Sequence, residues 1–474
     1  VEEYQFPPWS GDYTVNENIQ QIYTLAFPAG AVEHLVPLFD WLDSLRGVMQ
    51  RNAKVLLGID DGLLLTHSVD DRGAVLQGGL STMGSLDQGC LGWLARLYWL
   101  YYRHTGDTEF LRRRALPFMR GVMRVYEAML EPDGDHLSLK LSVSPEFGQP
   151  LPCSDPNRYY SRLVRNGTNA SFQLACIHML ADMLLQASAD LGQAPAAAWA
   201  TIRQKVPPYT LVGAAHNRRI GLWEGQDLTV PHRHHSHLAA IYPFDTLCEP
   251  TSEQQAIVEN SIDHWVNMGL GDASEWSLPW SAIILARCGC AEAAYLHLEI
   301  WRTLFVNEGL CSVYIPRHWG ISLHVRKKLF ADGLRISPWG RSISYTAAGR
   351  EKCEIMQLDG TMGAATAVYE MLVHSRGDLV RVFPAVPERW REVSFQGIHV
   401  PGGFRIDGRR AGGRVRAVSV HSRRGGRIRL DVCGHDHMRL TRGRDVSLVA
   451  MPCVLDLQAN ERVRLTPGIA PRRP

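Results

Sequence analysis

Two asparagines stand two residues apart in segment 9–18 (Trp-Ser-Gly-Asp-Tyr-Thr-Val-Asn-Glu-Asn), just before an apolar run. A side-chain amide cannot act as a proton-transfer base, but its carbonyl oxygen accepts and its NH2 group donates, so it can hold a water molecule. If the segment is extended, Asn16 and Asn18 point to the same side and could face one cavity. The alternative is that one of them only caps the helix that follows.

Two acidic residues stand where a carboxyl group could move a proton or hold a charge. Glu146 lies between a proline and an aromatic residue in a long stretch without periodicity. Partial burial there would raise its pKa, as a general acid requires. Asp359 precedes a helical pattern, where the helix dipole would keep it ionised, so it could polarise an amide or take a proton from water. The plainer alternatives are a surface glutamate and an ordinary N-cap.

Histidines crowd the segment 232–238 (His-Arg-His-His-Ser-His-Leu). Imidazole rings donate and accept hydrogen bonds, so His232, His234 and His237 could bind sugar hydroxyls, with Arg233 as an anchor. Metal binding is an alternative, but no nearby Asp, Glu or Cys completes a recognisable ligand set. A purely structural cluster is a third. We favour the sugar site and predict neither a metal nor a cofactor.

Tryptophans supply the remaining sign of a carbohydrate site. An indole face can stack on the apolar face of a pyranose ring, and several tryptophans lie in or near the segments that lack helical periodicity. Trp9 and Trp276 are the candidates for substrate binding. The same positions also suit aromatic residues that pack in the core or at its rim.

Composition narrows the function classes. A chain of 474 residues predicts two domains or one large barrel. The net charge of +2 gives no electrostatic case for nucleic acid or an anionic membrane, and no run approaches 18 apolar residues, so we expect no membrane span. The chain begins with Val1 and lacks a signal-like segment, which indicates a trimmed or mature form. A secreted or periplasmic location is favoured.

Apolar residues spaced at three and four predict about a dozen helices before residue 376. The turn Thr105-Gly106-Asp107 separates two of them, and Asp107 should cap the second. Segments 131–165 and 207–231 should be loops. The expected helices span 19–51 with breaks near Pro28 and Pro37, 87–104, 108–130, 168–191, 196–206, 252–268, 276–289, 291–305, 325–332 and 359–375.

After Gly377 polar and apolar residues alternate, for example over 402–406 and 414–421. A period of two with intervening glycines predicts antiparallel strands. The expected fold is therefore mainly α: an (α/α)6 toroid, or barrel, over residues 1–376, followed by a small C-terminal antiparallel β-sandwich domain over 377–474. Successive helical hairpins would place the polar loops at one end, where they would line one cavity.

The motifs above resemble, in their order along the chain, those of glycoside hydrolase family 95, the inverting α-1,2-L-fucosidases and their α-L-galactosidase relatives. Each match alone is weak, but six in the right order are specific. The matching segments are 9–18 with its Asn-x-Asn, Thr105-Gly106-Asp107, Ser144-Pro145-Glu146, 232–238, Trp276-Ser277 and Asp359-Gly360.

The resemblance implies an (α/α)6 barrel flanked by two β domains, of which we expect the N-terminal one to be absent here. It also implies a mechanism. Glu146 would protonate the glycosidic oxygen, Asn16 and Asn18 would bind the attacking water, and Asp359 would polarise the amides. Inversion would follow, and a water between the reacting groups predicts carboxyls about 6.5–9.5 Å apart or more.

Some neighbours of these motifs depart from the family. Phe147 stands where the family has Asn, and Thr361-Met362 replaces Asn-Phe, so the resemblance indicates the reaction more closely than the sugar. We expect an exo-acting glycosidase that releases terminal α-linked L-fucose, or an L-galactose-like sugar, from an oligosaccharide or glycan. The alternatives are another (α/α)6 glycosidase, a sugar phosphorylase, and a degenerate carbohydrate-binding protein.

Overall fold

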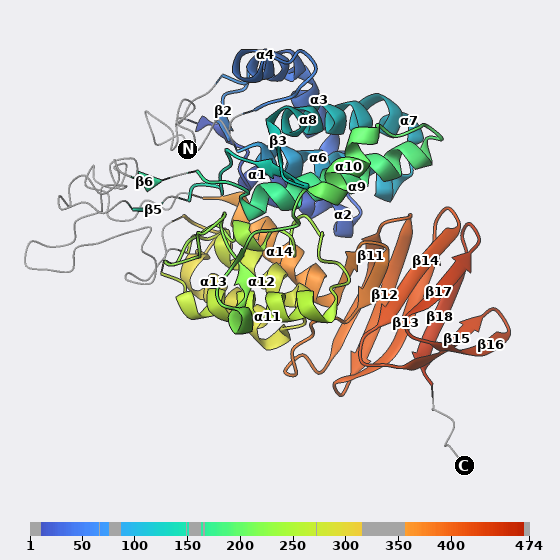
Figure 1. Cartoon of the computed structure of the whole chain (residues 1–474). Coiled ribbons are helices and arrows are strands. Elements are labelled where there is room, and N and C mark those ends of the chain that lie inside the picture. The colour runs from blue at the N-terminus through green and yellow to red at the C-terminus, as the bar shows by residue number, and fades with distance from the viewer. Residues whose placement is uncertain are drawn as a thin grey trace, which may run out of the picture.

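A mainly helical N-terminal region is followed by a C-terminal β-sheet region (Figure 1). This confirms the predicted change of structure along the chain. Trp9 and the predicted helix 325–332 lie outside the described residues. The computed structural model describes residues 11–65, 67–74, 87–147, 149–150, 163–164, 166–271, 273–314 and 356–468.

The first predicted helix, 19–51, is divided into four pieces. Proline lies in the first turn of the third piece, where a missing N–H removes no helical hydrogen bond. A left-handed Gly30 ends the second piece, because glycine adopts this conformation without a steric penalty. The pieces are α1 (Asn18–Thr24), α2 (Ala26–Ala29), α3 (Val36–Ser44) and α4 (Arg46–Leu57).

The later helices lie close to the predicted ranges. As predicted, Asp107 caps its helix, and its carboxylate accepts from the backbone N–H of Glu109 and of Phe110 at 3.0 and 2.9 Å. These helices are α6 (Gln88–Thr105), α7 (Thr108–Phe110), α8 (Leu116–Met129), α9 (Ser171–Asp190), α10 (Ala197–Lys205), α11 (Ser252–Met268), α12 (Ser277–Arg287), α13 (Ala291–Phe305) and α14 (Leu358–Leu372), with a π-helical turn at Leu111–Ala115.

Part of the expected loop 131–165 is a hairpin. Gly134, with a positive φ of 60°, forms the turn between β3 (Leu130–Asp133) and β4 (His136–Leu139). The prediction of a continuous loop was wrong here because glycine and proline also mark tight turns between short strands. Other short strands in this region are β1 (Tyr13–Thr14), β2 (Ser68–Val69), β5 (Gln149–Pro150), β6 (Leu163–Val164), β7 (Leu211–Val212) and β8 (Arg219–Ile220).

The C-terminal region holds two sheets, of four and six strands, in the orders β17-β14-β10-β9 and β11-β12-β13-β18-β15-β16. The six-stranded sheet is antiparallel, but β10 pairs with β14 in parallel, so the prediction of a wholly antiparallel region was wrong. The chain passes through three strands of the other sheet between them, which supplies the crossover that a parallel pair needs.

Most of these strands alternate more and less buried residues, as their period of two predicts, whereas β9 and the largely exposed β16 do not. The strands are β9 (Val373–Arg376), β10 (Leu379–Val382), β11 (Val393–Val400), β12 (Phe404–Ala411), β13 (Arg414–Ser422), β14 (Gly426–Val432), β15 (His437–Arg442), β16 (Asp445–Ala450), β17 (Cys453–Leu457) and β18 (Arg462–Pro467).

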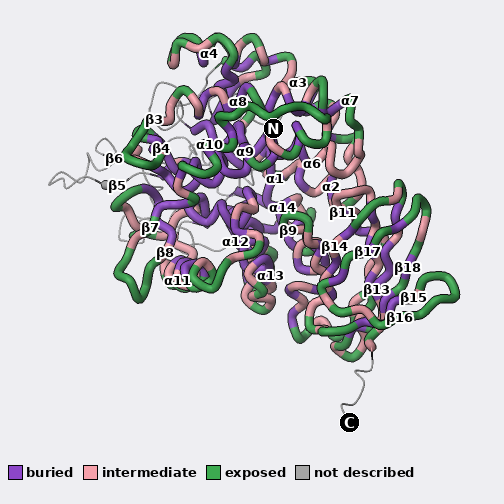
Figure 2. Tube along the Cα trace, turned by 45° about the vertical axis from the view of Figure 1, so that its right-hand side comes forward, coloured by how far each residue is buried: buried purple, intermediate pink, exposed green. Residues whose placement is uncertain are grey.

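Two large hydrophobic clusters hold these regions together. The helical cluster centres on fully buried aromatic residues such as Trp93, Trp280 and Phe118, while the β cluster includes Phe404 and Ile406. Figure 2 shows buried chain concentrated where α6, α9, α12 and α14 meet. Within the described residues, no helix is both long and apolar enough to cross a bilayer.

Helices far apart in sequence pack directly on one another. α1 contacts α14, and α6 contacts α8 and α9. The α6–α9 contact is close because Gly92 faces Cys176: a Cβ atom added at Gly92 would overlap the Sγ atom of Cys176. This contact depends on the missing side chain.

We expect Gly92→Ala to lower stability by about 1–3 kcal/mol, because an added methyl group overpacks a rigid core. The measurement is the free energy of unfolding in urea. Combining it with Cys176→Ala should restore most of the loss. Gly47→Ala is the control: a Cβ there meets nothing within 4 Å, so that variant should be unchanged or about 0.5–1 kcal/mol more stable. An unaffected Gly92→Ala protein would contradict the close α6–α9 packing.

Candidate active site

The two asparagines lie at the amino end of α1, but neither caps it. The N-cap is Glu17, which makes no side-chain capping bond, and Asn18 is the first helical residue. The segment 15–17 is a turn, so the expectation of an extended strand was wrong. The turn aims the two amides at different partners, because Asn16 contacts Glu146 and Asn18 contacts Asp359.

Glu146 is held between an amide and a guanidinium. Asn16 Nδ2 donates to Glu146 Oε1 at 2.8 Å, and Arg233 Nη2 forms an ion pair with Glu146 Oε2. The backbone of Glu146 has a φ of 53°, a left-handed conformation that a residue with a Cβ rarely adopts and that is common at functional sites. Contacts from two distant segments therefore maintain a strained residue.

The expected rise in the pKa of Glu146 is not found. Burial alone would raise this pKa, but nearby positive charge, chiefly that of Arg233, outweighs burial and holds the pKa well below its usual range. A nearby opposite charge favours the ionised form of a carboxyl group. Glu146 is therefore ionised at neutral pH in this arrangement.

Asp359 is buried in the first turn of α14, whose N-cap is Gln357. Its Oδ1 accepts from the backbone N–H of Gly360 at 2.9 Å, and its Oδ2 accepts from Asn18 Nδ2. Gly360 allows α14 to approach closely, since a Cβ there would lie 2.9 Å from the carbonyl oxygen of Glu275. The N-cap alternative for Asp359 is thus wrong, and its carboxylate binds an amide 341 positions away.

Sequence reasoning missed Glu275, which is buried beside Asp359. Burial and then the charge of Asp359 raise the pKa of Glu275 well above its usual range. Burial also raises the pKa of Asp359, but hydrogen bonds from Asn18 and Gly360 oppose that rise. Two buried carboxyls cannot both ionise readily. Glu275 therefore keeps the proton and Asp359 carries the charge, which corrects the expectation that the helix dipole alone keeps Asp359 ionised.

Glu17 is a second buried carboxyl that the sequence did not single out. Burial, followed by the charge of Asp359, raises its pKa well above the usual range. Gln21 donates to its Oε2. A lone glutamate beside a tryptophan or an asparagine has no diagnostic spacing. In the sequence, Glu17 and Glu275 could have been noticed only because they stand next to the predicted site residues Asn16, Asn18 and Trp276.

The histidine segment contributes two rings to the contacts around Glu146. His234 Nε2 lies 3.4 Å from Asn16 Nδ2, and the His234 ring meets Trp276 at a centroid distance of 4.7 Å. His232 packs on Phe147 at 4.8 Å and its Nδ1 accepts from the backbone N–H of His234. Burial lowers the pKa of His234 well below its usual range, so this ring is neutral.

His237 is buried in a short 3-10 turn, Ser236–Leu238. Among the described residues, neither of its ring nitrogens has a hydrogen-bond partner, and the Nδ1 atom of His234 also lacks one. Burial lowers the pKa of His237 to about 3, so it is neutral with one donor and one acceptor unused. His235, by contrast, is tied to Trp265 and to the backbone of Ser277.

The structure thus brings eight of the ten predicted site residues into two sets of contacts: six residues around Glu146, and the pair Asn18–Asp359 where α1 meets α14. His237 belongs to the same segment, but its ring nitrogens have no hydrogen bond to these residues or to any other described residue, and Trp9 is outside the described residues. Within the described part of the chain, no three His, Cys, Asp or Glu side chains are grouped so that they could hold a metal ion. The eight residues are Asn16, Asn18, Glu146, His232, Arg233, His234, Trp276 and Asp359.

Comparison with protein families gives two matches in sequence order. Residues 2–372 match the glycosyl hydrolase family 95 catalytic domain, and residues 374–451 match the glycoside hydrolase family 95 C-terminal domain. The chain is 25% identical over 414 residues to alpha-L-fucosidase 2 of Arabidopsis thaliana, covering 84% of this chain and 43% of that protein. It therefore spans less than half the length of this curated relative.

Solved structures share the fold at low sequence identity. A chain described as a candidate kojibiose phosphorylase from the human microbiome matches with a TM-score of 0.54 and 10% identity, covering 95% of this chain and 54% of that chain. A wild-type glycosidase matches with a TM-score of 0.46 and 14% identity, covering 79% of this chain and 86% of that chain. The first of these supports a common fold and carries no information on substrate.

Because the pKa of Glu275 is raised in the folded protein, we expect the stability of the protein to depend on pH. A carboxyl whose folded pKa is raised stabilises the protein below its unfolded pKa, and this contribution is lost as pH rises through the folded pKa. Glu275→Gln does not titrate. Near pH 4 the variant should be about as stable as wild type. Between the unfolded and the folded pKa of Glu275, the variant should gain stability over wild type by about 1.4 kcal/mol for each pH unit.

Thermal midpoints measured across pH test this expectation. Glu249→Gln is the control, because Glu249 pairs with Arg429 at the surface, where its side chain is 57% exposed, and its curve should run parallel to that of wild type. A Glu275→Gln curve that also ran parallel would show that Glu275 is ionised in the folded protein.

Proposed function

Because the chain belongs to glycoside hydrolase family 95, we propose that it is an exo-acting, inverting glycoside hydrolase. It releases a terminal α-linked L-fucose, or an L-galactose-like sugar, from an oligosaccharide or glycan. The observation that carries this proposal is the pair of contacts Glu146–Asn16 and Asn18–Asp359. Each contact joins a carboxyl group to one of two amides that stand two residues apart, which supports a role of these amides in water activation.

In this mechanism Glu146 protonates the glycosidic oxygen as the bond to the anomeric carbon breaks. The two amides hold the attacking water. Asn16 Oδ1 is buried and has no hydrogen-bond partner among the described residues, so it can accept a hydrogen from that water. Asp359 accepts a hydrogen bond from the NH2 group of Asn18, which increases the electron density on the carbonyl oxygen of Asn18, so that this oxygen accepts a hydrogen bond from the second hydrogen of the water. As the water oxygen bonds to the anomeric carbon, one of its protons passes to solvent, and Glu146 takes up a proton from solvent after the product leaves.

Glu146 must be protonated before it can act, whereas Arg233 keeps it ionised in the free protein. When a sugar hydroxyl becomes the partner of Arg233, burial becomes the dominant influence and raises the pKa of Glu146. Arg233 and His234 would then bind the sugar, together with Trp276, His232 and His237. Protonated Glu275 acts as a positioning residue, because its hydrogen bond to Asp359 helps to keep that carboxylate ionised.

We also propose that the helices close into an (α/α)6 barrel over residues 1–376, followed by a domain over 377–474. The packing of α1 on α14 supports closure, because it joins the first and last described helices of the region. A toroid would set the amino ends of these two helices beside each other, as the Asn18–Asp359 contact requires.

Glu146→Gln should lower kcat on a natural fucosyl glycan by about 10²–10⁴-fold, because the leaving oxygen loses its proton donor. The loss should be much smaller with a p-nitrophenyl glycoside, whose leaving group needs little protonation. Asn18→Ala should impair both substrates equally, because it affects the water. The measurement is kcat of each variant on both substrates by steady-state kinetics.

The control is Glu249→Gln, which should be fully active. Circular dichroism and thermal midpoints establish that each variant is folded. Full activity of Glu146→Gln on the glycan would remove Glu146 from the role of acid, and an equal loss on both substrates would assign it another role.

The stereochemistry of the product tests inversion directly. Proton NMR of the first-formed sugar from an α-linked substrate should show the β anomer, before mutarotation mixes the two forms. An α anomer would contradict an amide-bound water as the nucleophile. Turnover that requires phosphate would identify a sugar phosphorylase instead, and binding without any release of monosaccharide would identify a carbohydrate-binding protein.

A further inference from the structure

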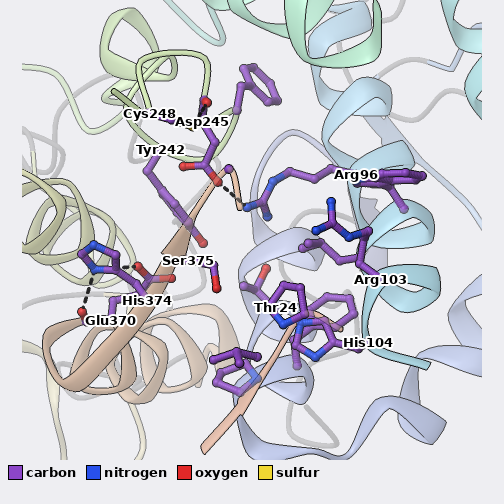
Figure 3. A pocket seen from close by; sticks show the side chains of 18 of the residues that line it. Thr24, Arg96, Arg103, His104, Tyr242, Asp245, Cys248, Glu370, His374 and Ser375 are labelled. Atoms are coloured by element: carbon purple, nitrogen blue, oxygen red, sulfur yellow. Dashed lines mark hydrogen bonds and ion pairs between the residues drawn. The ribbon is translucent and has the colours of Figure 1, made fainter. Parts of the chain in front are cut away.

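A second polar site lies where the helical region meets the first strands of the β region (Figure 3). It is a cavity of about 320 Å³. Its lining comes from α1, α6, α9, α14, β9 and β11, and from the turn that contains Tyr242 and Asp245. The close-up shows Arg96 and Arg103 from α6 and Ser375 from β9 reaching toward one space.

This cavity is separate from the candidate active site. Asn18 begins α1 and Thr24, in the cavity lining, ends it. Likewise Asp359 lies in the first turn of α14 and Glu370 in its last turn. A rise of 1.5 Å per residue places Glu370 about 16 Å along the helix from Asp359. The two sites therefore occupy opposite ends of the same helices.

The charges that line the cavity are balanced. Arg287 donates two hydrogen bonds to Glu370, both at 2.9 Å, and forms an ion pair with Asp245. Arg96 Nη2 pairs with the other oxygen of Asp245 at 3.0 Å. Three arginines and three carboxylates line the cavity in all. No net charge is left to attract an ion.

The histidines do not change this balance. Burial lowers the pKa of His104 to about 3 and that of His374 well below its usual range, so both rings are neutral at physiological pH. His399 also has a lowered pKa, chiefly through burial. Neutral imidazole rings offer hydrogen bonds but no charge.

Several buried polar atoms of the lining have no partner among the described residues. His374 Nδ1 donates to the carbonyl oxygen of Glu370 at 3.0 Å, so its Nε2 atom is an acceptor, and nothing donates to it. The Nη1 group of Arg96 and the hydroxyls of Thr246 and Ser375 are also unpartnered. A buried polar atom without a hydrogen bond is destabilising by about 1–3 kcal/mol.

A ligand for this cavity must accept from Arg96 and also donate to His374. Hydroxyl groups do both, whereas phosphate and carboxylate ions only accept and would face the lone pair of His374 and the carboxylates of Asp245 and Glu370. Apolar lining from Trp99 and Phe27 suits the carbon skeleton of a polyol. The volume is at the lower end of the range for small-molecule sites, which fits one sugar ring.

We propose that this interdomain cavity is a second binding site, separate from the candidate active site, for a neutral polyhydroxylated molecule of the size of a monosaccharide. Arg96 donates to one hydroxyl and His374 Nε2 accepts from another. Ser375 and Thr246 contact further hydroxyls. The inference does not rest on the proposed hydrolase activity, because it uses none of the residues of that site.

Isothermal titration of the full chain tests the proposal, with L-fucose, D-galactose and D-glucose as neutral probes and inorganic phosphate as the anion probe. At least one sugar should bind. Ser375→Ala and Thr246→Val should each weaken that binding by about 2–10-fold, the loss expected for one hydrogen bond. Neither hydroxyl has a hydrogen-bond partner among the described residues, so the thermal midpoint without sugar should not fall.

Two controls separate this cavity from other sites. Ser447→Ala, at an exposed position on β16, should leave the affinity unchanged, and so should Asn16→Ala in the candidate active site. Four outcomes would overturn the proposal: no sugar binding, binding that ignores Ser375→Ala and Thr246→Val, binding that Asn16→Ala abolishes, or cavity-dependent binding of phosphate alone. A crystal soaked in the binding sugar that held only water in the cavity would also overturn it.

Discussion

Burial of carboxyl groups at the amino ends of α1 and α14 is the constraint that organises this protein. Glu17, Glu275 and Asp359 are each almost inaccessible to water, and an ionised carboxylate without compensation is very unfavourable there. The structure compensates with an amide donor from Asn18, a backbone N–H at the start of α14, and protons retained on the other two groups. The same contacts join the first and last described helices of the helical region, so packing and site depend on one another.

Two carboxyl groups of the candidate site have opposite environments. Glu146 has a guanidinium beside it and an unusually low pKa, whereas Asp359 has no cation among its partners in the described part of the chain and shares its surroundings with a protonated Glu275. Environments that push two pKa values apart are typical of acid–base sites. In the proposed mechanism, the protonation of Glu146 depends on whether Arg233 pairs with it or with a substrate hydroxyl.

The positions of the buried carboxyl groups also agree with the direction of the helix dipoles of α1 and α14. Carboxyl groups gather at the amino ends of α1 and α14, where unpaired N–H groups favour anions. At the opposite end arginines are paired with carboxylates, and Arg376 donates to the backbone oxygen of Arg287, the last residue of α12. Helix dipoles favour this distribution. Between the two polar layers lies the aromatic core around Trp93 and Trp280, which separates the candidate active site from the interdomain cavity.

The sequence by itself determined the features that depend on neighbouring residues. Its periodicity located α6 and α11 within a residue or two, its turn residues identified the cap at Asp107, and its alternation predicted the strands after Gly377. The order of its motifs indicated the family. The sequence could not determine the backbone conformation just before α1, because the residues around Asn16 are compatible with both a turn and an extended strand.

Tertiary structure alone decided the properties that depend on distance and solvent. Glu146 meets an arginine 87 positions away, and Asn18 meets a carboxylate 341 positions away. Glu275 becomes important only because folding removes it from water beside Asp359. Local patterns carry information on backbone conformation, whereas a pKa and a shared proton arise from which distant groups the packed chain brings together and from how much water it excludes.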